Sequence, residues 1–293
     1  MGIICHNRNI GSFLFRRTDP PFFLLAPVSF LMPRYRITVE YDGTPFVGWQ
    51  SQDNGPSVQG RLEDAIKNFS SEGVRVKGAG RTDAGVHALG QVAHFDLKKS
   101  WDPLRIREAM NFHLRPDPIA VLNCGEVPAE FDARFSATAR HYLYKILNRR
   151  APTALDIKRV WRVQVPLDFE AMNDAAQVLV GHHDFTTFRA SACQANSPMR
   201  TLAKLDVFRH GEEIHIEASA RSFLHNQIRS LAGTLKMVGE GKWTKAEVKR
   251  ALECRDRKAC AAVAPPYGLY LIKVEYPEEN RLQPVSDRNS DRD

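Results

Sequence analysis

The chain has 293 residues, of which 43% are hydrophobic and 26% are charged, an ordinary globular composition. At roughly 100–200 residues per domain, this length predicts two domains or one large domain, and either can bury a core without a disulfide or a metal ion to stabilise it. The formal net charge of +7 is spread along the chain, so it favours a polyanionic partner such as nucleic acid but does not establish one.

The five cysteines are odd in number and include no C-x-x-C pair, so the sequence contains no readable disulfide framework or standard zinc site. They are typical of reduced thiols, and we expect a cytoplasmic protein. No apolar run approaches the ~20 residues that a membrane-spanning helix needs.

Residues 1–31 differ from the rest of the sequence. A basic pair precedes the apolar stretch Phe22–Leu31, as in a signal peptide, but three prolines punctuate the segment and no A-x-A cleavage site follows. The first convincing strand begins only after Met32. We therefore expect residues 1–31 to be a non-native or disordered extension and Met32 to be the true start; a targeting peptide is the alternative.

Short strands alternate with amphipathic helices from Tyr35 onward. In the first half, the spacing predicts a strand at Tyr35–Tyr41, a helix from Ser57 to about Phe69, strands at Val74–Lys77 and Gln91–Leu97, a helix from Asp102 to about Leu114, and a strand near Ile119–Leu122. Ser57 is a good helix N-cap, and Asp102 followed by proline is typical of a helix start.

The second half also alternates short strands with amphipathic helices. It predicts a strand at Tyr142–Leu147, a helix around Phe169–Leu179, a hairpin of Ala203–Arg209 and Glu213–Ala220, a helix from Phe223 to Val238, a helix after Thr244, and a closing strand at Leu269–Val274. Thr244 and Glu247 form a capping-box pattern.

Hairpins interrupt this order, so it does not fit the strict alternation of a parallel doubly wound sheet. We expect an α+β fold of two similar domains, each a mostly antiparallel sheet with helices on one face, and an active-site cleft between the domains. The expected N-terminal domain covers residues 32–138 and carries a catalytic loop, and the C-terminal domain covers residues 139–276. Residues 277–293 are polar and charged, and we expect them to be disordered.

The densest group of chemistry-bearing residues is the segment Gly78–His87, with the sequence GAGRTDAGVH. Its three glycines predict a tight backbone path that another group approaches closely. The glycine spacing is not that of a dinucleotide-binding loop, and Gly239–Lys242 lacks the register of a phosphate-binding loop. Taken alone, the segment favours a structural role, an Asx-turn in which Asp83 caps its own backbone and Arg81 makes a surface ion pair.

A wider comparison of motifs changes that interpretation. The run from Arg81 to His87 resembles the active-site loop of the TruA family of tRNA pseudouridine synthases, in which the aspartate is the catalytic nucleophile. The resemblance extends from about Arg36 to Tyr276 and includes further motifs in the family order, at Tyr41–Gln50, Ser57–Glu63, Phe131–Tyr144, Asp184–Phe188 and Ile228–Gly233.

The resemblance implies an isomerase that converts uridine to pseudouridine at positions 38–40 in the anticodon stem-loop of tRNAs, through a transient covalent adduct on Asp83. It implies that Arg229 pairs with Asp83 and keeps the carboxylate charged, since burial alone would favour its neutral form. Tyr142 is implied to stack on the flipped uracil and to help remove the C5 proton. Arg81 is implied to contact the RNA backbone or to fill the space that the target base leaves.

The same resemblance implies a homodimer with the tRNA lying across both subunits. The reaction adds and removes no atoms, so we expect no cofactor and no metal. Five histidines, His87, His94, His182, His183 and His225, form no recognisable metal set and are expected to be structural or to contact RNA. Trp49 is expected to pack in the core.

Two other functions stay open on the residues alone. A non-catalytic tRNA-binding or folding protein on the same scaffold would keep the basic surface and tolerate the loss of Asp83. A glycosidase-like hydrolase would need a second carboxylate near Asp83, and the nearest one after it in the sequence is Asp96.

Overall fold

The structure is a computed structural model that describes Gly2 and residues 32–280, except for the side chain of Glu279. Apart from Gly2, the expected extension at residues 1–31 lies outside the described residues, and so do all but the first few residues of the expected C-terminal tail. Within the part that is described, no helix has both the length and the apolar character to cross a membrane.

Among the described residues, ten strands form one sheet. They are β1 (Arg34–Tyr41), β2 (Lys77–Gly78), β3 (His87–Asp96), β4 (Ile119–Val127), β5 (Ala139–Asn148), β6 (Trp161–Val163), β7 (Gly181–Asp184), β8 (Met199–His210), β9 (Glu213–Ala220) and β10 (Leu269–Glu275). Their order is β4-β1-β3-β10-β5-β9-β8-β7, with β2 paired to β3 and β6 to β5. The pairs β3–β10 and β5–β6 are parallel, and the others are antiparallel.

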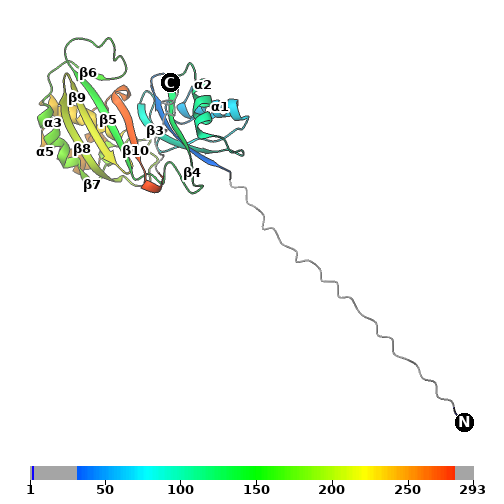
Figure 1. Cartoon of the computed structure of the whole chain (residues 1–293). Coiled ribbons are helices and arrows are strands. Elements are labelled where there is room, and N and C mark those ends of the chain that lie inside the picture. The colour runs from blue at the N-terminus through cyan, green and yellow to red at the C-terminus, as the bar shows by residue number, and fades with distance from the viewer. Residues whose placement is uncertain (1, 3–31, 281–293) are drawn as a thin grey trace. The chain divides into compact units, whose positions relative to one another are not determined.

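The two halves of the chain occupy adjoining stretches of this sheet (Figure 1). Strands β4, β1 and β3 come from the first half, and β5, β9, β8 and β7 from the second. The last strand, β10, lies between them and pairs with β3 through Tyr270 and Leu271. The α+β class and the mostly antiparallel sheet are therefore confirmed, and the sheet is continuous across the boundary expected near residue 138.

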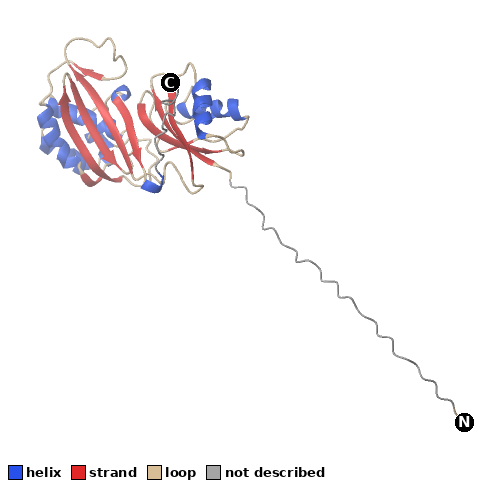
Figure 2. Ribbon diagram, viewed as in Figure 1, coloured by secondary structure: helices blue, strands red, loops and turns tan. Residues whose placement is uncertain are grey.

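Helices cover each half of the sheet (Figure 2). They are α1 (Val58–Ser70), α2 (Pro103–His113), α3 (Phe169–Ala176), α4 (Gln227–Gly239) and α5 (Lys245–Cys254). Short 3-10 turns lie at Gln177–Leu179, Thr186–Phe188, Arg257–Ala259, Pro266–Gly268 and Glu278–Asn280. Helix α2 packs on β4 and α1 packs on α2, whereas α3 packs on β8 and α4. Burial of their apolar faces against the sheet forms the core and fixes where the site residues point.

The helix starts that the sequence signals are observed. Ser57 Oγ accepts a hydrogen bond from the Gly60 N–H at 3.1 Å, and Asp102 Oδ1 accepts one from Leu104 at 3.0 Å. Thr244 and Glu247 form both hydrogen bonds of a capping box. Each cap satisfies an N–H that the first turn of a helix leaves free, so local chemistry alone places these boundaries.

Several predicted boundaries differ from the observed ones, and the strands expected at Gln91–Leu97, Ile119–Leu122 and Ala203–Arg209 are longer than predicted. Two further boundaries are wrong near the candidate site. The strand expected at Val74–Lys77 is only the two-residue β2. The helix expected from Phe223 begins at Gln227, because Asn226 has a left-handed backbone with φ of 63°. This conformation turns the chain immediately before α4, and the residues of that turn belong to the candidate site.

Candidate active site

Asp83 lies in a tight loop between β2 and β3 that is fixed by backbone contacts. Gly48 and Asp83 form an isolated bridge, and the Trp49 N–H donates to the Thr82 carbonyl at 3.0 Å. Gly48 has φ of 122°, and a Cβ there would lie 2.7 Å from the Thr82 carbonyl oxygen. Only glycine fits such a close approach, so the segment around Gly48 holds the Asp83 backbone in place.

The carboxylate of Asp83 points to the second half of the chain. Its Oδ2 is 3.2 Å from Arg229 Nη1, and its Oδ1 is 3.3 Å from His225 Nε2. Within residues 32–280, no backbone N–H donates to this carboxylate, so the Asx-turn expected from the loop alone does not form. The predicted pairing of Asp83 with Arg229 is present, whereas the contact with His225 was not predicted.

Burial differs among these three side chains. Arg229 is 16% exposed, Asp83 is 26% exposed and His225 is 46% exposed. Arg229 therefore meets the carboxylate from the protein side, and His225 meets it from the more open side. An ionised carboxylate that is partly shielded from water and held by an arginine is suited to nucleophilic chemistry.

The guanidinium of Arg229 is held in place by acceptors besides Asp83. Its Nε donates to the Ala264 carbonyl at 2.9 Å, and its Nη1 donates to Asn226 Oδ1 at 2.8 Å. The N–H of Ala264 donates back to the Arg229 carbonyl at 3.0 Å. A planar group with fixed donors loses little freedom when it forms one more hydrogen bond, so the orientation toward Asp83 is set before any substrate binds.

Asn226 uses its side chain in an unusual way for a residue that precedes a helix. An asparagine at the N-cap normally accepts a hydrogen bond from the first turn, but here no such bond forms and the amide oxygen accepts from Arg229 instead. Its left-handed backbone also costs roughly 1 kcal/mol or more for a residue with a Cβ, although asparagine tolerates it better than most. The i, i+3 spacing of Asn226 and Arg229 was the sequence signal that could have indicated this contact.

Tyr142 lies on β5 and faces the loop that carries Asp83. Its hydroxyl is 3.9 Å from the position that a Cβ on Gly80 would take, and its ring meets Phe223 edge-on with centroids 5.2 Å apart. Burial, assisted by the negative charge of Asp83, raises the pKa of Tyr142 to about 12 although Arg140 opposes the shift. The phenol is therefore neutral across the physiological range.

Of the remaining predicted residues, Arg81 is exposed, whereas Trp49, His87 and His94 are buried. Arg81 is exposed, and within the described part of the chain no ion pair involves it, so the expected surface ion pair is absent. Trp49 is buried and packs on Gly78, where a Cβ would lie 2.5 Å from its indole ring, which agrees with a packing role. His87 and His94 are buried, and their Nδ1 atoms accept hydrogen bonds from backbone N–H groups, as structural histidines do.

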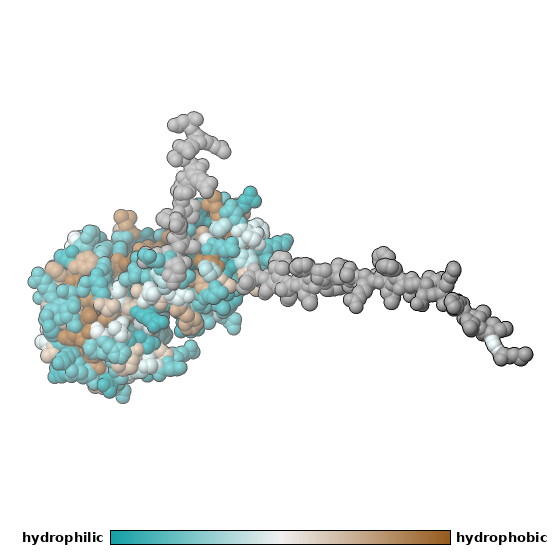
Figure 3. Space-filling model, turned by 60° about the horizontal axis from the view of Figure 1, so that its bottom comes forward, coloured by the Kyte–Doolittle hydropathy of each residue, from teal (hydrophilic) through white to brown (hydrophobic). Residues whose placement is uncertain are grey.

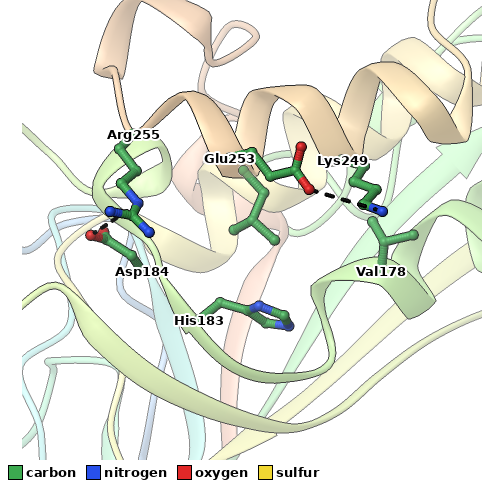
Figure 4. A pocket seen from close by; sticks show the side chains of 7 residues that line it. Val178, His183, Asp184, Lys249, Glu253 and Arg255 are labelled. Atoms are coloured by element: carbon green, nitrogen blue, oxygen red, sulfur yellow. Dashed lines mark ion pairs between the residues drawn. The ribbon is translucent and has the colours of Figure 1, made fainter.

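A pocket of about 360 Å³ lies elsewhere, beside β7 and α5 (Figure 4). Its wall includes two ion pairs, Arg255 with Asp184 at 3.7 Å and Lys249 with Glu253 at 3.9 Å. None of the site residues discussed above lines this pocket. The described residues contain no group of histidine, cysteine and acidic side chains that could hold a metal ion.

The fold and the site together define a class: an α+β protein in which the carboxylate of a glycine-rich loop in the first half is paired with a shielded arginine from the second half. A family model for tRNA pseudouridine synthases matches residues 37–136 and 175–277 of this chain. The chain belongs to the tRNA pseudouridine synthase family, and it is therefore an enzyme, an isomerase.

Three similar proteins share the name tRNA pseudouridine synthase A. The chain is 61% identical over 247 residues to tRNA pseudouridine synthase A of Sinorhizobium fredii, covering 84% of this chain and all of that protein. It is 61% identical over 257 residues to that of Allorhizobium ampelinum, covering 87% and 99% of the two chains. The value for Afipia carboxidovorans is 61% over 245 residues, covering 84% and 100%. A solved Cbf5-Nop10-Gar1 complex aligns with 13% identity and a TM-score of 0.30, over 69% of this chain and 45% of that one, too distant to support any argument.

Proposed function

We propose that this protein isomerises uridine to pseudouridine at positions 38–40 in the anticodon stem-loop of tRNAs, with Asp83 as the nucleophile. The observation that carries the proposal is the ion pair of Asp83 with Arg229 at 3.2 Å, formed between a backbone-fixed loop and a side-chain-fixed arginine. The family membership and the net charge of +7 support an RNA substrate.

The reaction breaks the N1–C1′ bond of uridine, rotates the uracil and forms a C5–C1′ bond. A proton leaves C5 and one is taken up at N1, so the atoms balance without a co-reactant. Asp83 attacks the uridine and forms a transient covalent adduct that is released when the new bond is complete. Arg229 orients the carboxylate for this attack by a charge-assisted hydrogen bond at 3.2 Å.

Tyr142 contacts the target uracil, and Arg81 contacts the surrounding RNA. The target base must leave the stack, because C5 and C1′ cannot be reached inside a helix. Tyr142 stacks on the extruded uracil. Its neutral hydroxyl helps to remove the C5 proton as a relay, in which the oxygen accepts that proton while its own proton passes to a neighbouring acceptor. Arg81, exposed beside Asp83, contacts the RNA backbone or fills the space that the base leaves.

The proposal extends to assembly and location. The protein is a homodimer with the tRNA lying across both subunits, and it works in the cytoplasm. The resemblance to the family supports the first statement, and the unpaired cysteines support the second. Of the described residues, Cys124, Cys193, Cys254 and Cys260 are all free thiols.

The two alternatives are less well supported. Asp96 lies at the opposite end of β3 from Asp83 and pairs with Arg34 at 2.7 Å, so it does not supply the second carboxylate that a hydrolase would need. A non-catalytic tRNA-binding protein would have no need for the paired Asp83 and Arg229.

The test is to incubate the purified full chain with an unmodified tRNA transcript and to map pseudouridine at single-nucleotide resolution. We expect pseudouridine within positions 38–40. Binding of the transcript without any pseudouridine would support the non-catalytic alternative, and pseudouridine only at other positions would show that the proposed substrate site is wrong.

A further inference from the structure

A rigid turn formed by residues 132–136, called here the aromatic turn, presents an exposed phenylalanine. Asp132 Oδ1 accepts hydrogen bonds from the Arg134 N–H at 2.8 Å and the Phe135 N–H at 3.0 Å. The Ser136 hydroxyl oxygen accepts from the Asp132 N–H at 3.0 Å, and the Ser136 N–H donates to the Asp132 carbonyl at 2.9 Å. These bonds fix the backbone on both sides of Phe135.

The aromatic turn is also attached to the core beneath it. Ala133 is fully buried, its N–H donates to His94 Nδ1 at 3.0 Å, and its carbonyl accepts from the Tyr276 hydroxyl at 2.6 Å. The ring of Phe131, immediately before the turn, is 1% exposed. The turn therefore cannot move without breaking buried hydrogen bonds, which are costly to leave unmade.

On this rigid support Phe135 is 73% exposed, and the guanidinium carbon of Arg134 lies 5.4 Å from its ring centroid. The face of the molecule in Figure 3 is mostly hydrophilic, with hydrophobic residues in small separate patches. An aromatic side chain on a backbone that is already fixed has only its own rotamer freedom to lose when a ligand packs on it, so such a ring is well suited to be a binding anchor.

One buried arginine joins the aromatic turn to the candidate active site. Arg140 Nη2 donates to the Arg134 carbonyl at 2.7 Å and to the Ala79 carbonyl at 2.6 Å, and Nη1 donates to the Arg221 carbonyl. Ala79 begins the loop that carries Asp83, and Arg221 begins the segment that leads to His225. The aromatic turn therefore lies beside both halves of the site.

Exposed cations surround this junction. Arg134 and Arg221 are exposed next to the shared Arg140, and Arg81 is exposed in the neighbouring loop. A planar apolar ring among arginines is complementary to a nucleic acid, since the ring can stack on a base while the cations approach phosphates. A protein partner would be expected to bury a larger apolar area than one ring.

We propose that Phe135 is a stacking platform for an unpaired nucleobase of the RNA substrate, other than the target uridine, with Arg134 and Arg221 binding the adjacent phosphates. The inference rests on the proposed function, because it assigns a second contact for the same RNA. Phe135 does not touch the reacting atoms; it contributes binding energy for the RNA beside the site.

The first experiment compares Phe135→Ala with Phe135→Trp in equilibrium binding to an unmodified tRNA transcript and in single-turnover rate at saturating protein. We expect Phe135→Ala to weaken affinity about tenfold, as the loss of one base–aromatic stack does, and to leave the saturated rate within about twofold. Phe135→Trp should restore the affinity. Phe112→Ala is the matched control, because Phe112 is 68% exposed on α2, and it should bind normally.

The second experiment identifies the base. Abasic sites are introduced one at a time into the unpaired positions of the anticodon loop, and binding is measured with the unchanged protein and with Phe135→Ala. One abasic position should weaken binding to the unchanged protein and have no effect on Phe135→Ala. The proposed stacking role of Phe135 would be overturned if Phe135→Ala and the unchanged protein bound the transcript with equal affinity. It would also be overturned if each abasic site weakened binding by the same factor in both proteins. An unchanged protein that binds but forms no pseudouridine would instead contradict the proposed function.

Discussion

The Asp83 backbone is placed by main-chain contacts with the segment around Gly48, whereas the Arg229 guanidinium on α4 is oriented by hydrogen bonds of its own side chain. The first depends on the close approach of Gly48 to Thr82 and on main-chain hydrogen bonds. The second depends on the amide of Asn226 and the carbonyl of Ala264. Side-chain changes in the Asp83 loop should therefore alter chemistry without moving the site, but changes to the side chains around Arg229 should alter geometry.

The largest effect is expected from Asp83→Asn and Asp83→Ala. Both should abolish pseudouridine formation and leave tRNA affinity within a few-fold, because the carboxylate acts as the nucleophile and the loop backbone stays in place. Pseudouridine mapping and equilibrium binding on the same transcript provide the measurement. More than trace activity in either variant would show that another residue is the nucleophile.

A smaller loss of turnover is expected from Tyr142→Phe. This change keeps the ring that stacks on the uracil and removes the hydroxyl, so affinity should be unchanged and the single-turnover rate should fall by about 100-fold, within the range of general acid–base catalysis. Because the pKa of Tyr142 is about 12, ionisation of this residue should cause no change in rate between pH 6 and about pH 10. Tyr142→Leu is the comparison, and it should lose affinity as well. A Tyr142→Phe enzyme with normal turnover would leave only the stacking role.

The smallest effects should come from Asn226→Gly and Asn226→Ala, which separate the backbone of the turn from its side chain. Both remove the acceptor for Arg229 and should slow turnover by about three- to tenfold, the equivalent of one hydrogen bond. Only Asn226→Ala forces a less tolerant residue into the left-handed region, so its free energy of unfolding should be lower than that of Asn226→Gly by roughly 1 kcal/mol. Equal denaturation midpoints for the two variants would contradict this account of the turn.

The sequence predicts the features that depend on neighbouring residues, and it does not by itself predict those that depend on distant contacts. Ser57, Asp102 and Thr244 were placed correctly as helix caps, because a cap depends on residues within one turn of each other. The pairing of Asp83 with Arg229 was predicted only through resemblance, since 146 positions separate them.

The parts that were missed depend on tertiary contacts. The left-handed Asn226 exists because its side chain has a partner in Arg229 instead of in the first turn of α4, and this choice cannot be made from helix propensity. The contact of His225 with Asp83 follows from that turn. Likewise, no local pattern specifies that β10 joins the two halves into one sheet, because strand neighbours are set by long-range pairing.

The central claim is that the contact between the two halves of the chain serves catalysis: Arg229 binds the Asp83 carboxylate and does not bind an RNA phosphate. The direct test compares Arg229→Leu with Arg221→Leu, an exposed arginine on the same segment, in single-turnover rate and in affinity for one tRNA. Arg229→Leu should lower the rate by about 100-fold and leave affinity within a few-fold, since a buried charge partner of the nucleophile is lost. Arg221→Leu should lower affinity and leave the saturated rate nearly unchanged. An Arg229→Leu enzyme that binds poorly but turns over normally at saturation would show that Arg229 is a phosphate contact and would contradict the account.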